Sequence, residues 1–367
     1  MFPKTRFIFF FFLSAAILFL MNGCHRAGPE LSLFRADPAR SGAIKESARI
    51  SGRVIWKTEI GLWPVSTPAI SRGFAYLGCA DNKLLAIDIR GGKTAWEFKT
   101  GGAVPSSPAV FEGVVYFGCA DGKFYAVDAG KGTQRWSFAD GSLINSSPNL
   151  GEGKVYFGSW KGLIYALNAG DGKLMWKFQC GERITSSPAL KDGILYVGCW
   201  DKNLYALSAS TGKLKWKFTA GGRIGSTPAV SDGLVFFGSV DKNVYCLDAQ
   251  TGKLRWKYAT EAVVDSSPAV AGQTVYAGSW DGFVYALDFQ GKLKWKYQTG
   301  GRIMSSPLVA GNTLYVGSDD KNLYAVDIRQ GKSRWLFRTG DSVNSSPVIS
   351  HGTLFITSYD RYLYALK

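Results

Sequence analysis

The sequence is poor in the residues that most catalytic and metal centres need. It has only two histidines, His25 and His351, which is too little material for a histidine-based metal site or a catalytic triad. None of its six cysteines adjoins another, and no Cys-x-x-Cys-His sequence is present. These absences exclude covalent haem attachment and leave no visible disulfide framework.

A long apolar run opens the chain. Two basic residues precede the run over residues 7–21, which is too short to span a bilayer comfortably and is typical of a signal peptide. Residues 21–24, Met-Asn-Gly-Cys, resemble the lipobox of bacterial lipoproteins, which implies cleavage after residue 23 and a lipid on Cys24. An ordinary signal peptide cut elsewhere is the alternative, and the chain is exported in either case. His25 replaces the Asp that holds such lipoproteins at the inner membrane, which favours an outer-membrane lipoprotein facing the periplasm.

Charge and composition narrow the possible partners and the fold class. The chain carries 43 Lys and Arg against 28 Asp and Glu, a net charge of +15. A basic exported protein favours anionic neighbours such as lipid headgroups, envelope polymers or an acidic protein surface, and no nucleic acid is expected there. The 44 glycines and 14% aromatic residues indicate many short strands and tight turns.

A repeat of about 40 residues runs through the chain. In every unit a tryptophan precedes the proline of a Ser/Thr-Pro pair by 12 residues, and successive units are offset by 40 residues except for one step of 39. The tryptophans are Trp56, Trp96, Trp136, Trp176, Trp216, Trp256, Trp295 and Trp335, and the prolines are Pro68, Pro108, Pro148, Pro188, Pro228, Pro268, Pro307 and Pro347. Each unit reads as four short strands joined by Asp/Gly and Asp/Asn turns, which is the pattern of a propeller blade.

The two ends of the chain predict how the ring closes. The last unit stops after its third strand, at residues 364–367, while a spare strand, Val54-Ile55-Trp56-Lys57, precedes the first unit. We therefore predict an all-β, eight-bladed propeller with four antiparallel strands per blade, closed by an N-terminal strand that completes the C-terminal blade. The expected organisation is a signal peptide over 1–23, a tether and lead-in segment over 24–53 and the propeller over 54–367.

Several segments resemble those of pyrroloquinoline quinone (PQQ)-type propellers. Residues 246–256, Cys-Leu-Asp-Ala-Gln-Thr-Gly-Lys-Leu-Arg-Trp, are similar to the tryptophan-docking motif A-x-D-x-x-T-G-x-x-x-W, and residues 34–42 are similar to the motif that precedes such propellers. The resemblance covers roughly residues 54–367. It implies eight blades, with each repeat tryptophan packed between neighbouring blades as a structural staple. The family contains PQQ-dependent dehydrogenases and, among lipoproteins, the non-enzymatic outer-membrane protein assembly factor BamB, which this chain resembles most in organisation.

The resemblance also allows a comparison with the dehydrogenases of this family, whose characteristic features are not found in this sequence. They carry a disulfide between adjacent cysteines, a Ca²⁺ with Glu, Asn and Asp ligands, and a catalytic Asp. Here the carboxylates recur at one turn position in seven blades, which indicates a turn role for Asp81, Asp121, Asp201, Asp241, Asp281, Asp320 and Asp360. We therefore assign no catalytic residue, no metal ligand and no cofactor, and PQQ with Ca²⁺ belongs only to the alternative that the chain is a dehydrogenase.

Candidate binding residues are those at which the blades differ. The position three residues before each proline and the position after each second strand vary widely, and we expect both to open on one face, around the channel mouth. Arginines five residues before three of the prolines should join them. The predicted partner-binding residues are Arg183, Arg223, Arg302, Trp160, Trp200, Trp280, Tyr359, Asn145, Asp265 and Asn344. The alternative is that the aromatic residues only cover the seams between blades and that the arginines are solvated.

These patterns favour a non-catalytic, lipid-anchored envelope scaffold. Its expected partners are envelope proteins or unfolded outer-membrane proteins, as the resemblance to the assembly lipoproteins implies, together with the membrane through the lipid. A PQQ-dependent dehydrogenase and a periplasmic ligand-binding or sensor propeller are the alternatives.

Overall fold

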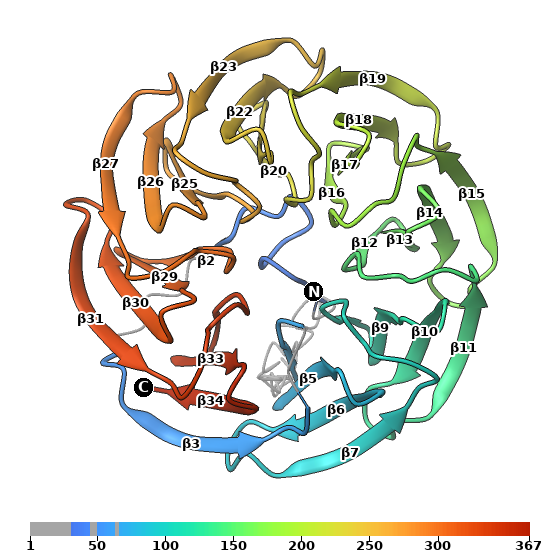
Figure 1. The fold of residues 1–367 in the computed structure, drawn as a ribbon. Helices are drawn as coiled ribbons and strands as arrows, with labels where there is room; N and C mark the ends of the chain where they lie inside the picture. Colours follow the sequence, from blue (N-terminus) through green and yellow to red (C-terminus); the bar gives the residue numbers. More distant parts are fainter. Residues whose placement is uncertain (1–30, 45–49, 63–65) are drawn as a thin grey trace, which may run out of the picture.

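A computed structural model describes residues 31–44, 50–62 and 66–367, and this part of the chain is built from strands alone. Eight blades follow one another in chain order around a central channel (Figure 1). Each blade has four antiparallel strands, which confirms the fold class predicted from the repeat. None of the described residues forms a helix long and apolar enough to cross a bilayer.

The four strands of each blade follow one another in order from the channel to the rim. The innermost strands are β4 (Ala69–Ser71), β8 (Ala109–Phe111), β12 (Asn149–Gly151), β16 (Ala189–Lys191), β20 (Ala229–Ser231), β24 (Ala269–Ala271), β28 (Leu308–Ala310) and β32 (Val348–Ser350). The second strands are β5 (Phe74–Cys79), β9 (Val114–Gly118), β13 (Lys154–Gly158), β17 (Ile194–Gly198), β21 (Leu234–Gly238), β25 (Thr274–Gly278), β29 (Thr313–Gly317) and β33 (Thr353–Ser358). The third strands are β6 (Lys83–Asp88), β10 (Lys123–Asp128), β14 (Leu163–Asn168), β18 (Asn203–Ser208), β22 (Asn243–Asp248), β26 (Phe283–Asp288), β30 (Asn322–Asp327) and β34 (Tyr362–Leu366). The outer strands are β7 (Thr94–Lys99), β11 (Gln134–Ala139), β15 (Leu174–Gln179), β19 (Leu214–Thr219), β23 (Leu254–Ala259), β27 (Leu293–Gln298), β31 (Lys332–Arg338) and β3 (Val54–Glu59).

The hydrophobic core lies in the seams between blades. The second and third strands are buried on both faces, whereas the outer strands alternate between half-buried and exposed residues. Phe124 of one blade stacks on Phe157 of the next, with ring centroids 4.1 Å apart. Continuous apolar runs in the two middle strands are therefore required, because both faces of each blade pack against a neighbour.

The repeat tryptophans link each blade to the next. The indole N–H of Trp136 donates to the carbonyl of Ala169 at 3.1 Å, and the hydroxyl of Tyr116 donates to the same carbonyl at 3.0 Å. The glycine of the docking motif leaves room for this ring, since a Cβ on Gly172 (φ +73°) would lie 2.6 Å from the Trp136 indole. Every repeat tryptophan makes the equivalent hydrogen bond, and Trp335 makes it to Ile50 at 2.7 Å.

The ring closes as the chain ends predict. β3 pairs with β34 in antiparallel register, from Val54 opposite Leu366 to Glu59 opposite Tyr362. The N-terminal strand is thus the fourth strand of the C-terminal blade, and β3 lies beside β34 at the rim (Figure 1). Such closure leaves no unpaired blade edge between the first and last repeats.

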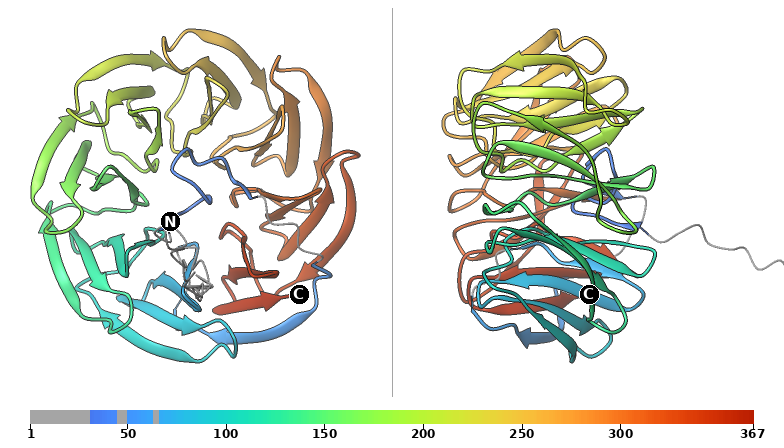
Figure 2. Two further views of the ribbon diagram at one scale, coloured as in Figure 1. Left: turned by 180° about the vertical axis from the view of Figure 1, so that it is seen from behind. Right: turned by 90° about the vertical axis from the view of Figure 1, so that its right-hand side faces the viewer.

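Residues 31–44 form a plug across one end of the channel. β1 (Leu31–Ser32) pairs with β8, and β2 (Ala43–Ile44) pairs in parallel with β28. Between these strands, backbone N–H groups of four successive blades donate to carbonyls of the plug, from Leu190, Val230, Val270 and Val309 to Pro38, Ala39, Ser41 and Gly42. In the side view this blue segment lies at one face of the disc (Figure 2).

Two buried arginines hold the plug against the blades. Arg40 has no exposed surface and donates to the carbonyls of Pro188 (3.0 Å), Pro148 (2.7 Å) and Ser147 (3.2 Å). Arg35 reaches the opposite side of the ring, where it donates to the carbonyls of Pro268 and Pro307. Burial lowers the pKa of both guanidinium groups to about 9, so both remain charged at neutral pH. The plug therefore ties distant blades together through charged hydrogen bonds.

Candidate binding site at the channel mouth

The plug closes one end of the channel, and no other described segment closes the opposite end, which we call the open end. The open end is formed by the loops before the repeat prolines and by the turns after the second strands. It contains a cavity of about 280 Å³, and Phe34 of the plug contributes to its lining. The Gly-Lys turns lie at the opposite face, because successive strands of a blade alternate in direction.

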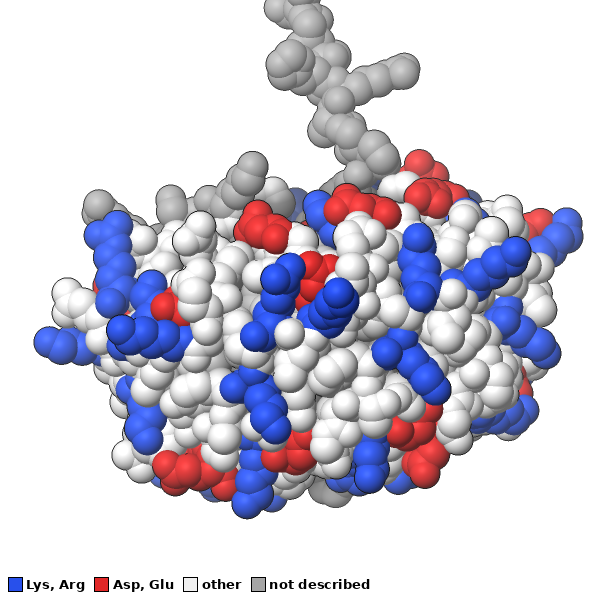
Figure 3. Space-filling view, turned by 90° about the horizontal axis from the view of Figure 1, so that it is seen from above, with Lys and Arg blue, Asp and Glu red and all other residues white. Residues whose placement is uncertain are grey.

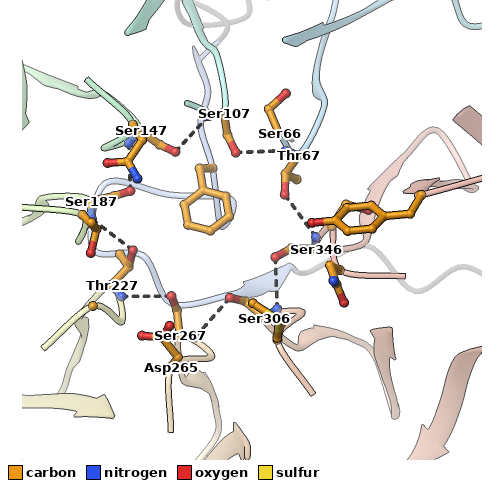
Figure 4. Close-up of a pocket in the computed structure, with 18 residues that line it drawn as sticks. Ser66, Thr67, Ser107, Ser147, Ser187, Thr227, Asp265, Ser267, Ser306 and Ser346 are labelled. Carbon is orange, nitrogen blue, oxygen red and sulfur yellow. Dashed lines mark hydrogen bonds between the residues drawn. The ribbon is translucent and has the colours of Figure 1, made fainter. Parts of the chain in front are cut away.

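A closed ring of hydrogen bonds surrounds this cavity (Figure 4). In each blade the backbone N–H of the Ser or Thr before the proline donates to the hydroxyl oxygen of the equivalent residue in the next blade. The donor–acceptor distances lie between 2.9 and 3.2 Å, from Thr67 through Ser107, Ser147, Ser187, Thr227, Ser267, Ser306 and Ser346 back to Thr67. None of the eight hydroxyls donates to an acceptor within the described residues, so their hydrogens are available to the cavity.

Four of the predicted site residues line the cavity, namely Asn145, Asp265, Asn344 and Tyr359. Asp265 projects from the wall in Figure 4, and no described residue hydrogen-bonds or ion-pairs with its carboxylate. Burial raises the pKa of Asp265 above its usual value, and the positive charge of Arg223 opposes this effect. The amide oxygen of Asn344 is buried and also has no partner among the described residues.

The predicted arginines and tryptophans form a stack beside the cavity. The guanidinium carbon of Arg183 lies 4.9 Å from the ring centroid of Trp160 and 3.5 Å from that of Trp200. Arg223 covers Trp200 at 4.2 Å. Trp160 is nevertheless 40% exposed, so this Arg–Trp stack combines fixed geometry with accessible surface.

A second arginine–tryptophan contact lies further round the ring. Arg302 lies 5.5 Å from the Trp280 ring centroid and forms an ion pair with Asp319 at 2.8 Å. All ten predicted residues thus lie at the open end of the channel, and the structure joins four of them into one stack. On the side of the rim that Figure 3 shows, Lys and Arg side chains are spread among acidic ones without one dominant patch.

Some predicted features lie outside the described residues, and some described features were not predicted. Cys24, the signal peptide over 1–23 and Val65 of the mouth positions belong to the undescribed part of the chain. Sequence reasoning placed residues 34–42 in a lead-in motif but did not find that Phe34 lines the cavity or that Arg35 and Arg40 are buried. The two arginines inside that motif were the available signal.

Comparisons with known proteins agree on the repeat and on the fold. A family model described as outer membrane protein assembly factor BamB matches residues 40–162. A second model, described as the β-propeller of the β-alanine-activating enzyme, matches residues 143–318. The chain is an eight-bladed propeller with PQQ-like repeats. Among curated protein sequences, no match to this PQQ-like propeller is found.

Solved structures similar to this PQQ-like propeller have different functions. BamB from Moraxella catarrhalis superposes with a TM-score of 0.76 at 19% identity, covering 86% of this chain and 99% of that one. The computationally designed protein Ika8 gives the same four values. Quinohemoprotein alcohol dehydrogenase from Comamonas testosteroni gives a TM-score of 0.78 at 15% identity, covering 91% of this chain and 80% of that one. At these identities the likeness shows the fold alone.

The mouth of this PQQ-like propeller does not fit a quinone held with Ca²⁺. Calcium takes six to eight oxygen ligands, mostly carboxylates and carbonyls, whereas the described residues lining the cavity offer one carboxylate, Asp265, and two side-chain amides, Asn145 and Asn344. Within the described residues, no three His, Cys, Asp or Glu side chains lie together as a metal site. The five described cysteines are free and buried, and burial raises the pKa of the Cys119 thiol to about 11.

Proposed function

We propose that this propeller is a non-catalytic, lipid-anchored envelope scaffold that binds protein partners during outer-membrane protein assembly. The partner surface is the Arg–Trp stack at the open end of the channel. The observation that carries the proposal is the stack itself, in which Arg183 lies between two indoles while Trp160 stays partly exposed.

The chemistry of the stack suits protein recognition. Tryptophan and arginine are the residues most enriched at the energetic centres of interfaces. Holding their side chains in place before binding lowers the entropy lost on association. The match of residues 40–162 to the assembly-factor model supports the choice of outer-membrane proteins as partners.

The lipid anchor is part of the same proposal. A lipid on Cys24 would tether the chain on the side of the plug, because Leu31, the first described residue after Cys24, belongs to the plug and pairs with β8. The open mouth then faces away from the point of attachment. Changing Cys24→Ser should abolish incorporation of radiolabelled palmitate and release the protein from the membrane fraction. Persistent labelling of that variant would refute lipidation at this residue.

The partner proposal is tested with a urea-unfolded outer-membrane β-barrel protein as the probe. The probe is diluted from urea, and its binding to the purified propeller is followed by fluorescence anisotropy. We expect the triple variant Trp160→Ala, Arg183→Ala, Trp200→Ala to weaken binding about thirtyfold, since loss of one strong interface anchor alone costs ~2 kcal/mol.

Two controls separate the stack from general surface effects. Val240→Ala alters the equivalent turn position next to Arg223, whose carbonyl accepts a hydrogen bond from the Val240 N–H at 3.1 Å, but removes none of the stacked side chains. Arg90→Ala removes an exposed arginine at the opposite face. Both should bind the probe like the unaltered protein, and all variants should keep the same melting temperature. Undiminished binding by the triple variant would refute the proposed surface.

A further inference from the structure

Two of the buried cysteines are in contact with one another. Cys180 follows the outer strand β15 of the third blade, and Cys199 follows the second strand β17 of the fourth blade. Both side chains belong to one apolar cluster in the seam between these blades, where they are 4% and 0% exposed. A hydrogen bond between the two thiols, together with burial, raises the pKa of the Cys180 thiol. The two sulfur atoms therefore lie within hydrogen-bond contact in the folded chain.

The repeat shows that side chains at these two positions face each other in other blades as well. Ser318 donates its hydroxyl hydrogen to the Thr299 hydroxyl at 3.3 Å, and Ser358 donates to the Thr339 hydroxyl at 3.2 Å. Each of these pairs is separated by 19 residues, as the two cysteines are. The contact between the cysteines thus follows from the course of the blade backbone.

The fourth blade alone has cysteine at both positions of this contact. In the first two blades the residues 19 positions before Cys79 and Cys119 are Ile60 and Thr100. Cys79, Cys119 and Cys246 each belong to a different apolar cluster from that of the cysteine pair. Among the described cysteines, the pair is therefore the one set of thiols that can bond without a rearrangement of the blades.

We propose that Cys180 and Cys199 form a disulfide bond across the seam between the third and fourth blades. Two thiols in hydrogen-bond contact need only a short approach to reach the S–S length of ~2.05 Å. The reaction is thiol–disulfide exchange with a small disulfide as the oxidant. The thiolate of one cysteine displaces one thiol from the oxidant, and the second cysteine then displaces the other. The two protons and two electrons that the cysteines lose convert the oxidant into two thiols.

Burial determines when the bond forms. The pKa of Cys180 is raised in the folded chain, whereas only a thiolate attacks a disulfide. We therefore expect the bond to form while the blades assemble, before the seam excludes the oxidant. Oxidising compartments such as the periplasm supply disulfide oxidants, and the predicted signal peptide would direct this chain there. Once the seam is complete, the same burial protects the bond from reductants.

The bond would fix the loop that carries Arg183 of the Arg–Trp stack. Without the disulfide, hydrogen bonds hold this loop to the turn after β17. The Cys199 thiol donates to the Glu182 carbonyl at 3.1 Å, and the Trp200 backbone N–H donates to the Arg183 carbonyl at 3.2 Å. A covalent link at the start of the loop would restrict the movement of Arg183 relative to Trp200.

The test refolds the full-length protein, in detergent, from urea and dithiothreitol into mixtures of reduced and oxidised glutathione. Samples are quenched with acid, free thiols are blocked with N-ethylmaleimide in urea, and tryptic peptides are analysed by mass spectrometry. Trypsin separates the two cysteines, because it cleaves after Arg183 and Lys191. We expect peptide 178–183 to be joined to peptide 192–202, with two hydrogens lost. Dithiothreitol should separate the peptides and return all five described cysteines as free thiols.

Calorimetry on matched variants supplies a second readout. The bond closes a loop of about 20 residues, which should raise the melting temperature of the oxidised protein by roughly 4–5 °C over the reduced protein. The double variant Cys180→Thr, Cys199→Ser carries the residue pair that the repeat has at 299 and 318, so it should fold. It should melt at one temperature with or without oxidised glutathione. Cys119→Ser should keep both the joined peptides and the temperature shift.

Three results would contradict the proposal. Recovery of Cys180 and Cys199 as N-ethylmaleimide adducts at every glutathione ratio would refute it. Linkage of either residue only to glutathione or to another cysteine would refute it as well. An equal rise in melting temperature in the double variant would show that the stabilisation does not come from this bond. The disulfide does not depend on the proposed partner surface, so either proposal can fail alone.

Discussion

Removing the Arg40 side chain should destabilise the whole propeller, although Arg40 lies outside the repeats. Arg40 is itself fully buried, and its guanidinium donates to the carbonyls of Pro188, Pro148, Ser147 and Phe34. Arg40→Ala removes the donor that these carbonyls share, and of the four only the Pro188 carbonyl is shown to keep a second side-chain donor, the Asn149 amide at 3.0 Å. Leaving a buried acceptor without its donor costs ~1–3 kcal/mol, so the loss over these carbonyls together comes to ~3–5 kcal/mol.

This loss of free energy converts into a measurable fall in melting temperature. For a chain of this size the unfolding entropy is ~0.7 kcal/mol/K, so a loss of ~3–5 kcal/mol lowers the melting temperature by roughly 4–7 °C. Differential scanning calorimetry measures the shift. Arg40→Lys keeps the charge but cannot reach several carbonyls in a planar fork, so it should fall between the unaltered protein and Arg40→Ala.

A surface arginine supplies the control for this experiment. The Arg90 side chain is 85% exposed and pairs only with neighbouring Asp88, so Arg90→Ala should change the unfolding free energy by less than ~0.5 kcal/mol. If Arg40→Ala melted within 1 °C of the unaltered protein, the plug would not be a stabilising part of the fold. Equal effects of the two substitutions would also refute the reasoning.

Three further predictions follow from the repeats and from perturbed pKa values. Trp56→Ala should cost ~3–5 kcal/mol and lower the melting temperature in calorimetry, because this indole packs at the closing blade and donates to Ile89; an unchanged melting temperature would contradict the closure role. Burial raises the pKa of the Cys246 thiol to about 12, so Ellman's reagent at pH 8 should label the described cysteines only after unfolding in urea, and rapid labelling of the folded protein would contradict this. The hydrogen bond from Arg255 lowers the pKa of Asp248 to about 2. The ionised Asp248 carboxylate therefore contributes less than ~1 kcal/mol to the free energy of unfolding. Because the pKa is lower in the folded state, this contribution is complete above pH 4 and is lost as the pH falls towards 2. Asp248→Asn should flatten the fall in melting temperature over that pH range, and an unchanged slope would contradict the assignment.

Sequence reasoning predicted the blades and their closure because both follow from local, repeated chemistry. The spacing between tryptophan and proline recurs in every blade, so the hydrogen bond from Trp136 to Ala169 has an equivalent at each of the eight repeat tryptophans. The same counting placed Asn145 and Asp265 at the mouth, because equivalent positions in a propeller lie at the same height.

The plug could not be predicted in this way. Residues 31–44 have no repeat and no alternating pattern, and the partners of Arg40 include the carbonyls of Pro148 and Pro188, which lie 108 and 148 residues further along the chain. The sequence predicted the residues of the Arg–Trp stack but not their contacts with one another. Its residues were expected on one face, but the position of Arg183 between Trp160 and Trp200 depends on side-chain conformations across two blades.

The course of the plug determines how the protein would respond to tension. A pull on the chain before Leu31 reaches β8 first, then the successive inner strands that hydrogen-bond with residues 38–44, and only afterwards β3. The load is shared by blades on both sides of the channel, while β3, which could be peeled from β34 one hydrogen bond at a time, is shielded from it. A protein held by its N-terminal end in a moving envelope would keep its ring shut under forces that would unzip a directly tethered closing strand.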